Sequence, residues 1–127
     1  MFLPKVLATM PARNDIALYV IDNASTDTTQ EYLASFKDQI HVITIKENRG
    51  FTNGYKVGLA QINTEIFCLL SSDVEVNEGW IEPVLEMFEE RKKLGIVQPK
   101  IKSWHRKDEF EYAVSCGGYI DKLGYPF

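Results

Sequence analysis

Two carboxylates, Asp73 and Glu75, directly follow an apolar run at residues 66–70 and could together bind a divalent cation. The run is typical of a buried strand, and side chains two residues apart on an extended chain point to the same side. Burying both charges without a partner would be costly, so solvent, a basic group or a metal must offset them. Hard cations bind carboxylate oxygens and share their remaining positions with phosphate and water, which favours a phosphorylated substrate. The alternative is a solvated acidic turn before a helix.

The elements that must position these carboxylates alternate between strands and helices. Strands are predicted at residues 16–21, 41–45, 66–70, 95–98 and 112–114. Two helices are predicted at residues 3–10 and 55–62, the second with Val57 packing inward. A third is predicted to begin at an Asp27 N-cap, with Gln30 in the capping-box position, and a fourth at an Asn77 N-cap. In the last helix Trp80, Ile81, Val84, Leu85 and Phe88 form an apolar stripe. This alternation predicts an α/β domain with a mostly parallel sheet.

Parallel strands bring their carboxyl ends to one edge of a sheet, where ligands bind in open α/β folds. Three polar loops follow predicted strands, at residues 22–26, 47–54 and 71–77. We therefore expect these loops to converge. In the second loop, Gly50 and Gly54 either let backbone N–H groups approach a phosphate or serve as turn glycines with positive φ.

Length and composition narrow the class of protein. The chain has 127 residues, 45% of them hydrophobic and 25% charged, which suits one globular domain. Its formal net charge of -4 argues against nucleic acid as a partner, because phosphate-tracking surfaces are basic. With two cysteines and no metal-binding spacing, we expect a cytoplasmic location, with the inner face of the membrane as the alternative.

Three blocks of sequence, in order, resemble the family 2 glycosyltransferases, which have the GT-A fold. The blocks read VIDNASTD at residues 20–27, ENRGF at 47–51 and LLSSDVEV at 69–76. The resemblance covers roughly residues 16–100, and residues 117–127 look like an acceptor-side segment of some bacterial members. It implies a three-layer α/β/α, Rossmann-like GT-A domain over residues 1–127, truncated and lacking the usual first strand.

The resemblance also implies an activity and its site. The expected reaction moves a sugar from a UDP- or GDP-type nucleotide-diphospho-sugar to a hydroxyl of a glycan or lipid-linked acceptor. The transfer is expected to invert the configuration of the sugar. Polysaccharide biosynthesis is the expected process. The expected donor-binding residues are Asp22, Asn23, Ser25, Asn48, Gly50, Phe51, Gly54 and Asp73. Asp22 would bind the base or ribose, while Asp73 and Glu75 would hold Mg²⁺ or Mn²⁺.

Departures from the family pattern lead to two further expectations. No general base is identified, since such a residue is expected beyond residue 127, so the polypeptide alone should have little or no transferase activity. A missing strand would leave an exposed sheet edge, through which the chain could form a homo-oligomer. The alternatives to a transferase are therefore a non-catalytic binding or assembly module and an unrelated flavodoxin-like switch or nucleotide-binding domain.

Overall fold

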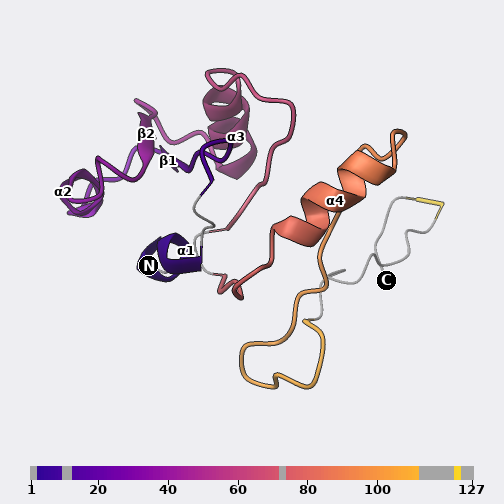
Figure 1. The fold of residues 1–127 in the computed structure, drawn as a ribbon. Helices are drawn as coiled ribbons and strands as arrows, with labels where there is room; N and C mark the ends of the chain where they lie inside the picture. The colour runs from indigo at the N-terminus through magenta and orange to yellow at the C-terminus, as the bar shows by residue number, and fades with distance from the viewer. Residues whose placement is uncertain (1–2, 10–12, 72–73, 112–121, 124–127) are drawn as a thin grey trace. The chain divides into compact units, whose positions relative to one another are not determined.

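The computed structural model describes residues 3–9, 13–71, 74–111 and 122–123. The chain divides into two compact units, Met1–Glu78 and Gly79–Phe127, and each is described by itself. The first unit contains, in order, α1, β1, α2, β2 and α3, and the second contains α4 (Figure 1). The single domain expected from the length stays a prediction.

The centre of the first unit is a parallel pair of strands. β1 (Tyr19–Asp22) and β2 (His41–Thr44) pair in parallel, and α2 (Thr29–Ala34) lies between them in the sequence. The hydrogen bond from Ile45 N to Asp22 O, at 2.8 Å, holds the carboxyl ends of the strands together. The predicted parallel α/β arrangement is thus confirmed for this part of the chain, with both strands shorter than expected.

Helices cover both faces of this pair. Val20 of β1 packs against the buried cluster of Leu33 and Ile40, and Leu33 belongs to α2. The next residue, Ile21, meets Gly58 of α3 (Phe51–Leu59). Successive side chains of a strand leave opposite faces, so α2 and α3 lie on opposite sides of the sheet (Figure 1).

The first helix joins the same core. α1 (Leu3–Thr9) agrees with the helix predicted at residues 3–10. Val6 is buried at 6% exposure, and Leu7 packs against the cluster of Leu33 and Ile40. Within the described ranges, none of the helices has the length and apolarity needed to cross a membrane.

The start and the packing face of α3 differ from the prediction. The helix begins at Phe51, four residues before the predicted start, and its buried positions are Gly54 and Gly58. Val57, predicted to pack inward, is 38% exposed. The physical reason is close approach: α3 lies so near β1 that glycine fits where a larger side chain would not.

Two predicted strands are wrong. Residues 66–70 and 95–98 have no ladder partner among the described residues, and neither segment is a strand. Leu69 is 58% exposed and Ile96 is 86% exposed, so both runs lack burial as well as pairing. An apolar run forms a strand only where another backbone supplies hydrogen bonds, and the sequence pattern does not reveal whether such a neighbour exists. The predicted strand at 112–114 lies outside the described residues.

Two predicted caps are also wrong. Asp27 lies before the N-cap residue Thr28 and accepts a hydrogen bond from Thr29 N at 3.0 Å, so it forms a local turn. α4 (Glu82–Glu90) begins five residues after Asn77, because Pro83 fits the first helical turn. Of the expected stripe, the N-cap residue Ile81 is buried at 8% exposure, whereas Val84, Leu85 and Phe88 on α4 itself are only partly buried.

The contact between Gly58 and Ile21 gives the first testable prediction. A Cβ at position 58 would lie closer to Ile21 Cδ1 than real Cβ atoms come to any neighbour. We expect Gly58→Ala to lower the free energy of unfolding by about 1–3 kcal/mol in urea denaturation, because overpacking forces α3 away from β1. Gly95→Ala is the control, since a Cβ there would have no atom within 4 Å. Equal stability of the two variants would contradict the close approach.

Candidate functional site

The loops after β1 and β2 are joined by a cluster of hydrogen bonds, which we call the asparagine clasp (Asn23, Asn48 and Gly50). Asn23 Nδ2 donates to Asn48 Oδ1 at 3.1 Å and to the Gly50 carbonyl at 3.3 Å. Gly50 N also donates to Asn48 Oδ1, at 2.9 Å. The predicted convergence of the first two polar loops is therefore present, and it is fixed by direct contacts.

The two glycines of the second loop have separate structural roles. Gly50 has φ +89° and precedes the first residue of α3, so it takes a backbone conformation that other residues rarely adopt. Gly54 is buried in α3, where a Cβ would lie 3.3 Å from Asn23 Cγ. Gly54 therefore leaves the space that the Asn23 side chain fills. Both observations support the turn and packing roles.

The loop after β1 has two features typical of a binding site. Asn23 Oδ1 is buried and has no hydrogen-bond partner among the described residues. Ala24 has φ +61°, a left-handed conformation that is costly for a residue with a Cβ. Strained backbone and unsatisfied buried acceptors concentrate at functional sites. The loop is thus held in one shape and presents an acceptor that a ligand donor could satisfy.

Asp22 ends β1 and is turned inward, with 3% exposure. Its Oδ1 accepts from Ser25 N at 3.0 Å, and its Oδ2 accepts from Gln30 Nε2 of α2 at 3.2 Å. Burial raises the pKa of Asp22, but the hydrogen bonds from Ser25 and Gln30 outweigh burial and the nearby Asp27, so the pKa lies below 3.8. Asp22 thus shapes the loop from within, and Ser25 is part of that arrangement.

Gln30 was missed as a site residue. The sequence pattern predicts a capping-box role for Gln30, whereas its side chain donates to Asp22 and ties the first turn of α2 to the loop after β1. The sequence shows only an amide side chain eight residues after a loop aspartate. This spacing is too common to predict a hydrogen bond between the two residues.

Phe51 lies at the start of α3 and is 72% exposed. Its ring meets that of Tyr55 edge-on, with ring centroids 4.9 Å apart. An exposed aromatic face beside the asparagine clasp could stack on a nucleotide base or a sugar. The geometry is therefore compatible with the predicted donor-binding role of Phe51.

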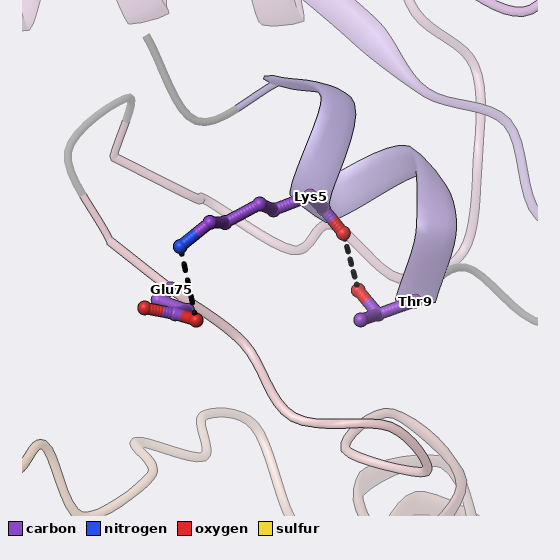
Figure 2. Close-up of polar contacts among 3 residues, drawn as sticks. All are labelled: Lys5, Thr9 and Glu75. Carbon is purple, nitrogen blue, oxygen red and sulfur yellow. Dashed lines mark hydrogen bonds and ion pairs between the residues drawn. The ribbon is translucent and has the colours of Figure 1, made fainter.

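The acidic segment is tied to the rest of the first unit on both flanks. On one side, Tyr55 Oη donates to the Leu70 carbonyl at 3.3 Å. On the other, Lys5 Nζ of α1 forms an ion pair with Glu75 Oε1 at 3.2 Å (Figure 2). Sequence reasoning missed both Tyr55 and Lys5, because each contact joins segments far apart in the chain. Asp73 lies outside the described residues.

Of the two predicted metal ligands, Asp73 and Glu75, the structure describes Glu75. Among the described residues, no group of three or more His, Cys, Asp and Glu side chains lies close enough together to hold an ion. Mg²⁺ and similar ions are often held by one or two carboxylates together with substrate phosphates, so such a group is not required. The Glu75 carboxylate is 37% exposed and offers the oxygen ligands that such ions prefer, and one of its oxygens is paired with the Lys5 ammonium.

A hollow on the first unit is separate from the asparagine clasp. It has a volume of about 240 Å³ and lies between the end of β2 and α3, lined by Ile45, Lys46, Glu47, Arg49, Asn53 and Val57. It is smaller than typical small-molecule sites, and Arg49 pairs with Glu47 at 2.7 Å beside it. None of the predicted donor-binding residues lines it.

The inward position of Asp22 predicts a pH-dependent stability. Because its folded pKa lies below 3.8, the ionised side chain stabilises the fold above that pH, and this contribution is lost as the pH falls through the folded pKa. Asp22→Asn should lower the free energy of unfolding at pH 7 by about 1–3 kcal/mol, because an amide cannot accept at both oxygens. The difference from wild type should shrink as urea unfolding is repeated toward about pH 3.

Asp38→Asn is the matched control, since Asp38 is an exposed carboxylate beyond α2. A constant difference between Asp22→Asn and wild type at every pH would contradict the assigned role of the Asp22 charge.

Comparison with known proteins agrees with this geometry. The family described as Glycosyl transferase family 2 matches residues 2–114. Polypeptide N-acetylgalactosaminyltransferase 6 of Mus musculus is 29% identical over 100 residues, which cover 76% of this chain and 16% of that protein. An uncharacterized glycosyltransferase of Haemophilus influenzae is 28% identical over 78 residues, covering 59% of this chain and 24% of that protein.

A third relative is the inactive polypeptide N-acetylgalactosaminyltransferase-like protein 5 of Macaca fascicularis, 27% identical over 88 residues, with 66% of this chain and 20% of that protein covered. The chain thus spans less than a quarter of the length of each of these relatives. No solved structure matches it. The family match extends over most of the chain, and the parallel β1–β2 pair with its helices forms part of a GT-A α/β fold; the chain belongs to glycosyl transferase family 2.

Proposed function

We propose that the chain supplies the donor-binding loops of a domain that transfers a sugar from a nucleotide-diphospho-sugar to an acceptor hydroxyl, with inversion. The observation that carries this proposal is the asparagine clasp, which joins the loops after two parallel strands at the edge where α/β folds bind ligands. The donor is a UDP- or GDP-type sugar. A direct contact of Asp22 with its base or ribose stays a prediction.

The charges around the clasp suit a nucleotide. The Ser25 backbone N–H and the Gln30 amide donate hydrogen bonds to the Asp22 carboxylate, so its negative charge is already stabilised within the protein. The unsatisfied Asn23 Oδ1 is an acceptor for a base N–H or a ribose hydroxyl. The exposed ring of Phe51, the first residue of α3 and the next residue after Gly50, offers a stacking face.

The acidic segment is proposed to serve the diphosphate. Asp73 and Glu75 would hold Mg²⁺ or Mn²⁺, which when bound would neutralise the leaving nucleoside diphosphate. Tyr55 positions this segment through the Leu70 carbonyl. Burial, and then the nearby Cys68, raise the pKa of Tyr55 above 10.0, so its hydroxyl stays protonated and donates at neutral pH.

We further propose a glycan or lipid-linked acceptor and a cytoplasmic location, or one at the inner face of the membrane. A net charge of -4 disfavours an acidic polymer such as nucleic acid as the partner. The relatives named as polypeptide N-acetylgalactosaminyltransferases make a polypeptide the alternative acceptor.

An assembly module is the second candidate. Ile66, Phe67 and Leu69 are 38%, 44% and 58% exposed, and this apolar run has no ladder partner in the described part of the chain. Such a run could pair with a second copy of the chain. This candidate predicts a concentration-dependent dimer in sedimentation velocity and no response to nucleotides.

The transferase proposal predicts stabilisation by a nucleoside diphosphate that depends on Mn²⁺. With ligand at about a hundredfold its Kd, the free energy of unfolding should rise by about 2.7 kcal/mol, seen as a higher Tm by differential scanning fluorimetry. UDP and GDP should be compared with and without Mn²⁺. The Mn²⁺-dependent part should disappear in Asp73→Ala and remain in Asp38→Ala. A Tm that responds to neither nucleotide would refute the donor-binding role.

Tyr55 provides a test of how the acidic segment is positioned. Tyr55→Phe removes the hydroxyl that bonds the Leu70 carbonyl while keeping the ring that meets Phe51. We expect the affinity for nucleoside diphosphate with Mn²⁺ to fall by about threefold to tenfold, since one hydrogen bond contributes about 1 kcal/mol. Tyr32→Phe is the control, because Tyr32 lies on α2 and its ring contacts Phe36, just beyond that helix. Isothermal titration calorimetry showing equal affinities for the two variants would contradict the positioning role.

A further inference from the structure

We propose that Lys5 is a built-in counter-cation for Glu75 that competes with Mg²⁺ or Mn²⁺ for that carboxylate. Lys5 Nζ lies 3.2 Å from Glu75 Oε1, and the two residues are 70 positions apart in the chain (Figure 2). The proposal rests on the proposed function for the role of Glu75 as a metal ligand. It adds that α1 regulates access of the ion to this carboxylate.

The position of Lys5 is set by the packing of α1. The adjacent Val6 is buried at 6% exposure, and Leu7 packs against the core cluster of the first unit. The Thr9 hydroxyl lies 3.3 Å from the Lys5 carbonyl and 3.0 Å from the Val6 carbonyl, and its single proton is shared between these two acceptors in the last turns of this short helix. The backbone of Lys5 is therefore held in place, and its side chain extends toward Glu75 (Figure 2).

An ammonium group at this distance competes directly with a metal ion. Lys5 pairs with Oε1, one of the two oxygens that Glu75 offers to a metal ion, and the positive charge of Lys5 also repels an approaching divalent cation. The competition is moderate because the two side chains are 55% and 37% exposed, and solvent screens such pairs. A weak, replaceable cation suits a carboxylate that must later accept a metal, because it balances the charge while the ion is away and is displaced when the ion arrives.

Direct measurement of Mn²⁺ binding tests this proposal. Free Mn²⁺ is titrated by electron paramagnetic resonance at low salt for wild type, Lys5→Ala and Lys5→Gln, the last keeping a long helix-forming side chain. Lys37→Ala is the control, because it removes the same charge from an exposed position beyond α2. Circular dichroism checks that each variant is folded.

We expect both Lys5 variants to bind Mn²⁺ about threefold to fivefold more tightly than wild type, which corresponds to about 1 kcal/mol or less. Lys37→Ala should resemble wild type, and Glu75→Gln should bind more weakly. The gain should shrink between about 0.01 and 1 M KCl, because salt screens the repulsion by Lys5. Equal or weaker binding by the Lys5 variants would overturn the proposal, as would the absence of Mn²⁺ binding in every variant.

This outcome is distinguishable from a failure of the proposed function. Nucleoside diphosphate binding by the asparagine clasp is measured separately by the thermal shift. Tight Mn²⁺ binding by Lys5→Ala without any nucleotide response would support the counter-cation while refuting the donor-binding role. A nucleotide response with unchanged Mn²⁺ affinity in the Lys5 variants would refute the counter-cation alone.

Discussion

The parallel pairing of β1 with β2 determines where the candidate site lies. Four residue pairs, from Tyr19 with His41 to Asp22 with Thr44, bring the carboxyl ends of the strands side by side. The loops that follow can then share hydrogen bonds, as Asn23 and Asn48 do. A one-residue slip would exchange the faces of Val20 and Ile21 and place the wrong side chains against α2 and α3. The core and the site thus depend on the same register.

Local patterns in the sequence predicted this part of the fold well. Apolar runs with loop signals located β1 and β2, and the helical periodicity located α1 and α4. The predictions failed where a distant neighbour decides the outcome. Residues 66–70 have a strand-like composition but no ladder partner in the described ranges, and α3 buries Gly58 because Ile21 lies against it. The composition of a segment indicates that it can form a strand, whereas a neighbouring backbone decides whether the strand forms.

The candidate site shows the same division. The predicted convergence of the first two polar loops is confirmed by the contacts of Asn23 with Asn48 and Gly50. The loop signatures did not identify Gln30 or Lys5, whose side chains reach carboxylates 8 and 70 residues away. Nor could they show that Asp22 points inward, since its burial follows from the donors that surround it. Residue types predicted that the first two loops meet, and long-range contacts determined how each side chain is held there.

Asp22 and Glu75 differ in how their negative charge is stabilised. They are the two carboxylates of the predicted site that the structure describes. Asp22 is 3% exposed and accepts hydrogen bonds from a backbone N–H and an amide, partners that no incoming cation readily replaces. The Glu75 side chain is partly exposed to solvent and forms an ion pair with the ammonium group of Lys5, which is carried on a flexible four-carbon chain. A carboxylate fixed by neutral donors suits a permanent role in shaping a loop. A carboxylate held by an exchangeable cation suits binding another cation, and this contrast agrees with the metal-binding role proposed for Glu75 and the loop-shaping position of Asp22.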